Sequence, residues 1–303
     1  MSFLWGIDLG GTKIEGVILD PHQDNLVIER ERVPTEKEGG YDHIVQQVAR
    51  LVDILSEKSG VRPEKLGMGT PGTTDPITGL LKNSNTTVLN GRSFQADVSK
   101  ALSIPVTMAN DANCFAIAEA RMGAVAEQMP EAAVVFGIIM GTGVGGGLVV
   151  NGHVLNGRQG IAGEWGHNFL DESGGPCYCG RVGCVETVIA GPSLERFYFQ
   201  ESGEKKGLKE IVQLANQGGD ATAGATLDRL HHFFGKGVGT IVNMIDPDAI
   251  VIGGGVGNIP TIYTEGVKEV EKYTFNHQLD TRFFKPSLGD SAGVFGAAFL
   301  VAD

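Results

Sequence analysis

Two stretches of the chain follow the same plan, in which short apolar runs are joined by glycine-rich or polar turns. The first begins with FLWGIDLGG at residue 3, continues through TKIEGVILD and ends with NLVIERERV at residue 33. The second begins with AAVVFGIIMGTG at residue 132, continues through VGGGLVV and ends with HVLNG at residue 157. Runs rich in β-branched residues and bounded by such turns are typical of strands. The repetition predicts a duplicated unit built on a three-stranded meander.

The rest of the chain alternates between strand-length apolar runs and helical patterns. Apolar residues from Ile44 to Leu55 recur at helical spacing, and Gly60 is expected to end that helix. Further strands are predicted at 66–70, 106–110 and 249–255, and further helices just after Asp111, near 192–200, 207–217 and 220–244, from about Pro260, and over 291–302. This alternation indicates the α/β class. We expect an N-terminal α/β domain over 1–116, with a helix at about 290–303 packing back on it, and a larger α/β domain over 117–289.

The charge of the chain excludes some classes of partner. The formal net charge is −12, and no basic stripe or arginine-rich arm is visible, which argues against a nucleic-acid surface. An anionic substrate would have to be bound by backbone amides, a helix terminus or a divalent cation. Residues 132–152 carry no charge, but six glycines interrupt them before Asn151, so buried strands are expected rather than a membrane span. No secretory signal pattern opens the chain, and we expect a cytoplasmic protein.

Three of the four cysteines gather in one short segment together with a histidine. His167, Cys177, Cys179 and Cys184 supply one nitrogen and three sulfurs, the ligand set of a tetrahedral Cys₃His zinc site. Four protein ligands would leave no position open for water, which predicts a structural role for Zn²⁺. The alternatives are incidental thiols or a disulfide, and the latter is disfavoured in a reducing compartment. Cys114 is interpreted as a small buried hydrophobe.

Two glutamates flank this cysteine-rich loop. Glu164 precedes His167 by three residues, and Glu186 follows Cys184 by two. Carboxylates placed beside a rigid loop are suitable acceptors for the hydroxyl groups of a sugar or another polyol. The alternative is that both glutamates are merely solvated.

Glycine is unusually frequent, with 45 of 303 residues, about twice the typical usage. Glycines concentrated in turns would suggest a backbone that approaches a ligand closely. Backbone amides in such turns can bind phosphate oxygens, and a carboxylate before the turn can hold Mg²⁺. These features predict a nucleotide phosphate site made of Asp8, Gly10, Gly11, Thr12 and Lys13 in the first meander and Gly141, Thr142 and Gly143 in the second. Gly254 and Gly255, after a later strand, are predicted to lie against the nucleoside. Taken singly, such a turn is usually only a hairpin turn, and the prediction rests on their repetition.

The segment GTGVGG, from Gly141 to Gly146, also fits the G-x-G-x-x-G pattern of dinucleotide-binding proteins. That motif requires a helix directly after it, whereas GLVVNGHVL is predicted to form a strand and a hairpin turn. We therefore reject the dinucleotide interpretation.

The segment MANDAN places Asn110 and Asp111 where a predicted strand gives way to a helix. Ligand chemistry in open α/β sheets collects at the carboxyl ends of strands. A carboxylate there can accept the proton of a sugar hydroxyl as its oxygen attacks the γ-phosphate of ATP, and Asn110 would orient the sugar. The alternative is that Asp111 is only the N-cap of the helix.

Together these motifs resemble the ROK family of sugar kinases and repressors, which has the actin-like, hexokinase-like ATPase fold. The resemblance covers essentially the whole chain. It is carried by DLGGTK at 8–13, GTPG at 69–72, NDAN at 110–113, GTGVGGG at 141–147, EWGH at 164–167, CYCGRVGCVE at 177–186 and DPDAIVIGGG at 246–255.

The resemblance implies two domains with a cleft and phosphorylation of a hexose that depends on ATP and Mg²⁺. It makes Asp111 the general base, and it implies sugar contacts from Gly72, Asn85, Asn110, Glu164, His167 and Glu186. His167 would bind zinc through one ring nitrogen and the sugar through the other, so that the metal fixes its position. Relatives are commonly homodimers.

Within the family, LLKNSNTTVLNGRSF at 80–94 and GEWGHN at 163–168 look most like the bacterial fructokinase/mannokinase branch, and fructose is the first expected acceptor. Mannose and glucose are alternatives, as is N-acetylglucosamine, because N-acetylglucosamine kinases share nearly all the other motifs. Many members carry a tryptophan shortly after the sugar-loop asparagine, where this chain has Val88. Two alternatives of another class are a repressor, for whose DNA-binding domain we expect no room before Asp8, and a nonenzymatic sugar-binding protein.

Overall fold

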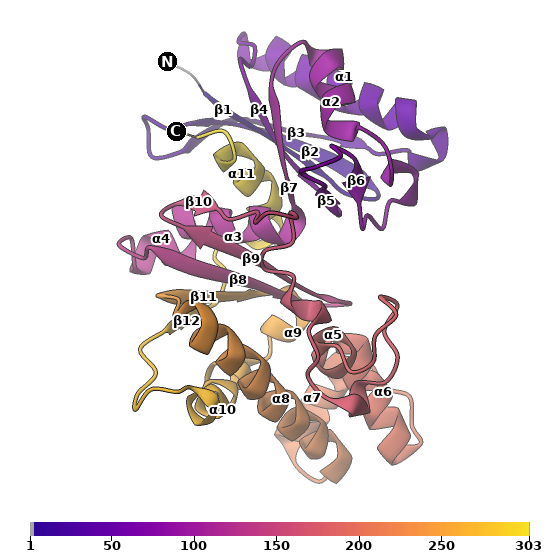
Figure 1. The fold of residues 1–303 in the computed structure, drawn as a ribbon, viewed down its shortest axis with the longest axis vertical. Helices are drawn as coiled ribbons and strands as arrows, with labels where there is room; N and C mark the ends of the chain where they lie inside the picture. Colours follow the sequence, from indigo (N-terminus) through magenta and orange to yellow (C-terminus); the bar gives the residue numbers. More distant parts are fainter. Residues whose placement is uncertain (1–2, 303) are drawn as a thin grey trace. The chain divides into compact units, whose positions relative to one another are not determined.

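The computed structural model describes residues 3–302, and its first sheet is formed by the first predicted meander and two later strands. The strands stand in the order β3-β2-β1-β4-β7 (Figure 1). Strands β1, β2 and β3 form the antiparallel meander, whereas β4 and β7 run parallel to β1. Their bounds are β1 (Leu4–Leu9), β2 (Lys13–Asp20), β3 (Leu26–Pro34), β4 (Leu66–Thr70) and β7 (Val106–Asn110).

The second sheet repeats this plan, with the strand order β10-β9-β8-β11-β12. A meander again leads to two strands that run parallel to its first strand. The bounds are β8 (Val134–Met140), β9 (Val144–Val150), β10 (His153–Val154), β11 (Ala249–Gly253) and β12 (Arg282–Phe284). The duplicated α/β architecture predicted from the two meanders is confirmed, and the segment after Gly143 is a strand, as expected.

The chain forms two compact units. The first unit contains residues 1–131, 147–162 and 287–303, and the second contains residues 132–146 and 163–286. The predicted domains, 1–116 with about 290–303 and 117–289, differ from these units at residues 117–131, 147–162 and 287–289, which belong to the first unit. Strand β9 begins in the second unit and continues into the first.

The predicted helices lie close to their expected positions. Four short helices, at 94–102, 124–128, 185–189 and 254–257, were not predicted, and the last begins inside the strand predicted at 249–255. In the first unit the helices are α1 (Tyr41–Ser59), α2 (Phe94–Leu102), α3 (Asp111–Arg121), α4 (Ala124–Gln128) and α11 (Ala292–Phe299), with a small hairpin of β5 (Thr73–Thr74) and β6 (Leu81–Lys82). In the second unit they are α5 (Val185–Ile189), α6 (Gly191–Ser202), α7 (Leu208–Gln217), α8 (Ala221–Ile245), α9 (Gly254–Gly257) and α10 (Glu265–Tyr273). The helix predicted from Pro260 is a 3-10 turn over Pro260–Tyr263 followed by α10. Within residues 3–302, every helix is too short or too polar to span a lipid bilayer.

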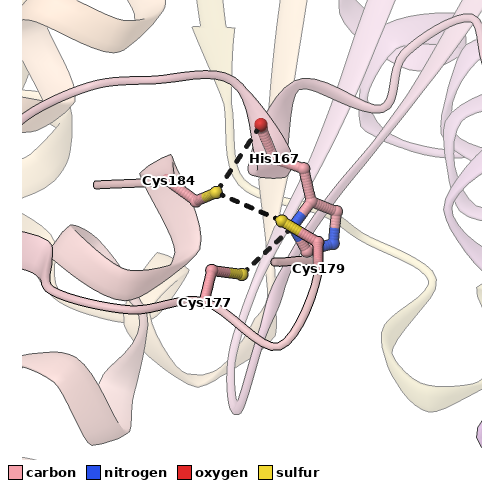
Figure 2. Close-up of side chains that lie close together, drawn as sticks. All are labelled: His167, Cys177, Cys179 and Cys184. Atoms are coloured by element: carbon pink, nitrogen blue, oxygen red, sulfur yellow. Dashed lines mark hydrogen bonds between the residues drawn. The ribbon is translucent and has the colours of Figure 1, made fainter. Parts of the chain in front are cut away.

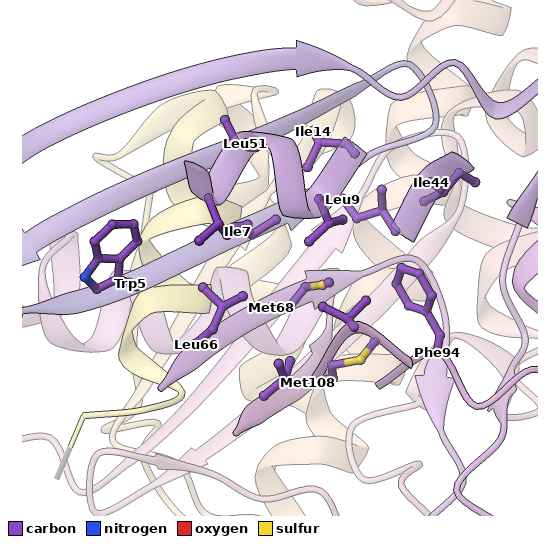
Figure 3. Close-up of a cluster of buried hydrophobic side chains, with 14 of the residues drawn as sticks. Trp5, Ile7, Leu9, Ile14, Ile44, Leu51, Leu66, Met68, Phe94 and Met108 are labelled. Carbon is purple, nitrogen blue, oxygen red and sulfur yellow. The ribbon is translucent and has the colours of Figure 1, made fainter. Parts of the chain in front are cut away.

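One face of the first sheet packs against helix α1 through large apolar side chains. Trp5, Ile7 and Leu9 alternate along β1 and are almost fully buried in one cluster with Ile44 and Leu51 of α1 (Figure 3). Alternation along a strand sends every second side chain to the same face. The period of two in WGIDL is therefore sufficient to assign this face to the core.

The opposite face of the same sheet carries glycines where helix α11 approaches its backbone closely. A Cβ atom at Gly67 would lie 1.8 Å from the carbonyl oxygen of Ala297 in α11, and one at Gly6 would lie 2.4 Å from the amide nitrogen of Ala298. A Cβ at Gly296 of α11 would in turn lie 1.8 Å from the carbonyl oxygen of Cys114 in α3. Part of the glycine excess therefore serves helix packing, which corrects the expectation that it reflects ligand-binding turns.

Candidate functional site

The carboxyl ends of the parallel strands β1, β4 and β7 gather polar residues at one edge of the first sheet. Asp8 of β1 pairs with Gly69 of β4, and Asp111 directly follows β7. Cβ atoms built at Gly69 and Gly293 would lie 3.2 Å and 2.8 Å from the Asp8 carboxylate oxygens. These two glycines leave room around the carboxylate, and neither was predicted as a site residue.

The structure gives the capping role at helix α3 to Asn110, not to Asp111. The Oδ1 atom of Asn110 accepts a hydrogen bond from the Asn113 N–H at 2.8 Å, and Asn110 is buried. Asp111 is the first residue of the helix, where its Oδ1 accepts the Ala112 N–H at 2.9 Å. The alternative that Asp111 is the N-cap is therefore wrong. Solvent reaches the Asp111 side chain, so its carboxylate is accessible to a ligand.

Both carboxyl groups at this edge bind protons more tightly than ordinary aspartates. Burial, followed by the negative charges of Asp111 and Glu15, raises the pKa of Asp8 from 3.8 to about 6, against a smaller lowering effect of Lys13. Reduced solvation also raises the pKa of Asp111, although solvent reaches it from one side. A carboxylate that its surroundings disfavour is suited to binding a cation or accepting a proton.

Asp8 should make stability depend on pH, and replacing it should remove that dependence. Its folded-state pKa is raised, so its contribution to stability is fully present below pH 3.8 and is lost as the pH rises through about 6. Ionised Asp8 then costs about 3 kcal/mol, since one pKa unit corresponds to about 1.4 kcal/mol. When the pH is raised from below 3.8 to above about 6, the free energy of unfolding of Asp8→Asn should increase relative to that of wild type by up to this amount. Denaturant unfolding at both pH values measures the gain, with the exposed Asp53→Asn as control. An equal difference at both pH values would contradict the prediction.

The first glycine turn, from Gly10 to Lys13, is closed by its own backbone. The Gly10 N–H donates to the Lys13 carbonyl at 2.9 Å, and Oγ1 of Thr35 donates to the Gly10 carbonyl at 2.7 Å. The Gly10 amide therefore shapes the turn. Gly11 and Thr12 are exposed at its tip, and Nζ of Lys13 lies 3.3 Å from Glu15. Thr35 was not predicted, because nothing in its sequence context marks it as a brace for a turn 25 residues away.

The second glycine turn, from Gly141 to Gly143, has the same closure and lies beside the glycines that follow β11. The Gly141 N–H donates to the Gly143 carbonyl at 2.9 Å. A Cβ at Gly254 would lie 2.2 Å from the Met140 carbonyl oxygen, and one at Gly141 would lie 3.9 Å from the Gly255 amide nitrogen. Gly191 at the start of α6 donates its N–H to the Gly141 carbonyl at 2.8 Å and was not predicted. The structure thus brings the second predicted phosphate turn and the predicted nucleoside segment together within the second unit.

The segment EWGH is anchored to the start of β9. Trp165 is buried and donates its Nε1–H to the Gly145 carbonyl at 3.0 Å. A Cβ at Gly166 would lie 1.9 Å from the Val144 carbonyl oxygen, so only glycine allows this approach. Trp165 and Gly166 therefore fix the backbone between Glu164 and His167, the two predicted sugar contacts, both of which are half-buried.

The four predicted metal ligands lie together (Figure 2). One ligand atom from each of His167, Cys177, Cys179 and Cys184 lies within 4.8 Å of every other. Nδ1 of His167 is 3.5 Å from the Cys177 sulfur, and the sulfurs of Cys179 and Cys184 are 3.6 Å apart. Tetrahedral zinc with Zn–S near 2.3 Å and Zn–N near 2.0 Å requires about 3.5–3.8 Å between its ligand atoms. The residues present therefore fit a tetrahedral metal ion.

Glycines allow the loop to turn around this point. Gly180 and Gly183 both have positive φ, at 87° and 75°, which other residues rarely adopt. A Cβ at Gly183 would also lie 2.5 Å from the Asp171 carbonyl oxygen. The Cys177 N–H donates to the Arg181 carbonyl at 2.8 Å, which closes the tip of the loop.

Glu186, in the first turn of α5, connects the metal loop to the second glycine turn. Its Oε2 accepts the Val144 N–H at 3.0 Å and would lie 2.5 Å from a Cβ at Gly143. One carboxylate oxygen is therefore engaged with the turn. The sequence predicted Glu186 only as a sugar contact and gave no sign of this link.

The ring nitrogen of His167 that faces away from the thiols has a partner within the loop. Its Nε2 lies 2.9 Å from the hydroxyl of Tyr178, and the two rings meet edge to face with centroids 5.1 Å apart. Burial of the hydroxyl end, then negative groups that include Glu186 and Glu164, raise the pKa of Tyr178. Tyr178 was not among the predicted site residues, although it stands between two predicted ligands.

The two remaining predicted residues, Gly72 and Asn85, belong to a polar loop of the first unit. Gly72 has φ 82°, and a Cβ there would lie 2.4 Å from the Lys82 carbonyl oxygen. Asn85 is exposed. The side chain of Asn90 accepts the Ser84 N–H and donates to the Ser84 carbonyl, both at 2.9 Å, and so fixes the backbone next to Asn85.

The predicted residues are divided between the two units. The first unit contains Asp8, Gly10, Gly11, Thr12, Lys13, Gly72, Asn85, Asn110 and Asp111. The second unit contains Gly141, Thr142, Gly143, Glu164, His167, Cys177, Cys179, Cys184, Glu186, Gly254 and Gly255.

Comparison with known proteins gives matches over nearly the full length. A family model described as the ROK family matches residues 4–303. The chain is 34% identical over 306 residues to N-acetyl-D-glucosamine kinase of Aliivibrio salmonicida, with 98% of each chain covered. It is 35% identical to the enzyme of the same name from Vibrio cholerae, again with 98% of each covered.

Solved structures give the same picture. The ROK hexokinase of Thermus thermophilus matches with a TM-score of 0.86 and 32% identity, covering 98% of this chain and 97% of that one. A ROK family glucokinase from Streptomyces griseus, in complex with glucose and AMPPNP, matches with a TM-score of 0.73 and 28% identity, covering 99% of each. These structures have the fold expected from the motifs.

Proposed function

The chain belongs to the ROK family and is a sugar kinase, and from that premise we propose that it transfers the γ-phosphate of ATP to a hydroxyl of N-acetyl-D-glucosamine. The observation that carries the choice of acceptor is the full-length similarity to several N-acetyl-D-glucosamine kinases, at 33–35% identity. The first expectation, fructose, has no support among these relatives, whereas the stated alternative has.

In the proposed reaction, Asp111 accepts the proton of the sugar hydroxyl. As that proton leaves, the hydroxyl oxygen forms a bond to the γ-phosphorus, the bond from that phosphorus to the bridging oxygen of ADP breaks, and ADP departs. The position of Asp111 after a parallel strand, its accessibility and its raised pKa all support this role. Asn110, fixed as the helix cap, would orient the sugar.

The other predicted residues supply binding. Gly11, Thr12 and Lys13 in one turn, and Gly141, Thr142, Gly143, Gly254 and Gly255 in the second unit, are proposed to bind ATP. Asp8 is the residue proposed to hold Mg²⁺, because burial and then the negative charges of Asp111 and Glu15 disfavour its ionised form, and a cation would relieve this. When bound, Mg²⁺ would neutralise charge that develops on the phosphates.

Sugar contacts are proposed for Gly72, Asn85, Glu164, His167 and Glu186. Zn²⁺ is proposed to occupy the Cys₃His cluster in a structural role. Two ligand pairs, His167–Cys177 and Cys179–Cys184, have the spacing of a tetrahedral ion, all four ligand atoms lie within 4.8 Å of one another, and all four are protein groups. A homodimer stays a prediction from the resemblance.

Glucose is the second candidate acceptor, because the ROK hexokinase and glucokinase structures match at 32% and 28% identity. A coupled assay of ADP release tests both, with N-acetylglucosamine, glucose, mannose and fructose compared at equal enzyme. We expect kcat/KM for N-acetylglucosamine to exceed that for each other sugar by at least about tenfold, the scale on which one substituent is discriminated in a pocket. A higher kcat/KM for glucose or fructose would overturn this choice, and no ADP release with any sugar would overturn the proposed reaction.

A further inference from the structure

Tyr178 has an unusual position for a residue of a metal-binding loop. It stands between Cys177 and Cys179, and 84% of the residue is exposed, yet its hydroxyl lies 2.9 Å from Nε2 of His167. The Tyr178 and His167 rings pack edge to face, with centroids 5.1 Å apart, but ring packing alone does not require the hydroxyl to face Nε2. The hydroxyl contact therefore points to the chemistry of His167.

The two nitrogens of His167 have different surroundings. Nδ1 lies 3.5 Å from the Cys177 sulfur and belongs to the group of four ligand atoms, so Nδ1 is the nitrogen that faces the metal position. A neutral imidazole that binds a metal through one nitrogen carries its proton on the other. Nε2–H would then donate to the Tyr178 oxygen. Metal-binding histidines are generally oriented by such a partner on the second nitrogen, and losing it weakens metal binding.

Under the proposed function, a sugar hydroxyl needs the same Nε2–H. One N–H group makes one strong hydrogen bond, so tyrosine and sugar would compete for it. The Tyr178 hydroxyl can leave Nε2 readily, because an exposed side chain changes rotamer within nanoseconds.

We propose that Tyr178 is a positioning residue that occupies Nε2–H of His167 in the sugar-free protein and is exchanged for a sugar hydroxyl on binding. This inference rests on the proposed function only in its second half. The first half, that Tyr178 orients the metal-binding histidine, concerns the sugar-free protein alone.

Tyr178→Phe tests both halves, because it keeps the ring and removes the hydroxyl. Release of Zn²⁺ to a chromogenic chelator is measured without sugar and with saturating N-acetylglucosamine. Without sugar, we expect the variant to release Zn²⁺ about tenfold faster than wild type. This is the lower end of the effect seen when a residue that hydrogen-bonds a metal ligand is lost. With sugar, the difference should largely disappear. By linkage, the metal-loaded variant should then bind the sugar more tightly, and KM should fall by more than kcat changes.

The matched control is Tyr198→Phe, which removes a hydroxyl 2.8 Å from Asp220 in the same unit and should release Zn²⁺ at the wild-type rate. Equal release from wild type and Tyr178→Phe without sugar would overturn the proposal. A rise in KM would overturn the exchange, because it would make Tyr178 a direct sugar contact. If wild type phosphorylates no sugar while the sugar-free difference persists, the proposed function fails and the orienting role of Tyr178 stands.

Discussion

Replacing Asp111 by asparagine is expected to lower kcat by about 10²–10⁴-fold, the usual contribution of a general base. Asparagine has nearly the same shape but cannot accept the proton of the sugar hydroxyl. Because Asn110 caps helix α3 through its own side chain, the helix start should remain intact in the variant. Sugar affinity, measured by calorimetry, should stay close to wild type. A loss in kcat without a comparable loss in binding identifies an interaction made only in the transition state.

The control for this variant is Asp42→Asn, since Asp42 is an acidic residue in the first turn of α1 and is exposed. It removes the same charge from a helix start and should leave kcat unchanged. The pH profile gives an independent measure. The raised pKa of Asp111 predicts that activity declines on acidification at a higher pH than an ordinary aspartate would give. Near wild-type kcat in Asp111→Asn would refute the proposed mechanism.

Replacing Cys179 by serine is expected to remove the metal and, with it, much of the sugar affinity. Cys179 is exposed, so the change leaves the core intact, and a serine hydroxyl is a far weaker zinc ligand than a thiolate. Metal content after dialysis against a chelator should fall from about one Zn²⁺ per chain to near zero. We expect KM for the sugar to rise at least about 10–100-fold. This is the size of effect already produced by losing a residue that only hydrogen-bonds a metal ligand. The reason is that His167 would lose its fixed orientation.

Cys114→Ala is the matched control, because Cys114 is a free thiol of the other unit. It should keep its zinc and its KM. Full zinc content in Cys179→Ser, measured by elemental analysis, would show that Cys179 is not a ligand. Retained sugar affinity in a metal-free variant would instead separate the metal from substrate binding.

Much of the fold could be predicted because its signals are local. The end of helix α1 at Gly60, which adopts φ 73°, follows from the freedom of glycine to take this conformation. The strands were recognised from β-branched runs between turns. The contacts of Gly6 with Ala298 and of Gly67 with Ala297 in α11 were not predictable in the same way. They join residues 292 and 230 positions apart, and a strand glycine alone does not indicate its neighbour.

Site residues could be predicted where the residue types alone define the chemistry. They could not be predicted where the role of a residue depends on how the chain folds around it. Three cysteines and a histidine indicate a metal whatever their surroundings. By contrast, the sequence could not decide whether Asn110 or Asp111 caps α3, because both residue types favour that position. The contact between Tyr178 and His167 depends on how one loop closes, and the link from Glu186 to Val144 depends on two segments 42 positions apart.

The choice of sugar shows another limit. The loop at 80–94 and the GEWGHN segment favoured fructose, but they cover a small part of the chain. The relatives at 33–35% identity match over 98% of it and are N-acetyl-D-glucosamine kinases. Specificity among hexoses rests on a few contacts, so local likeness in one loop is a weak guide to it.

The packing of α11 on the glycine face has a consequence for synthesis on the ribosome. Residues 287–303 follow the whole of the second unit in the chain, yet they complete the first. A nascent chain that has emerged as far as Pro286 can close its second unit, while the sheet face at Gly6 and Gly67 still lacks its helix. Domains commonly fold from the N-terminus as they are translated. Here the order should be reversed, and the first unit to begin translation should be the last to mature.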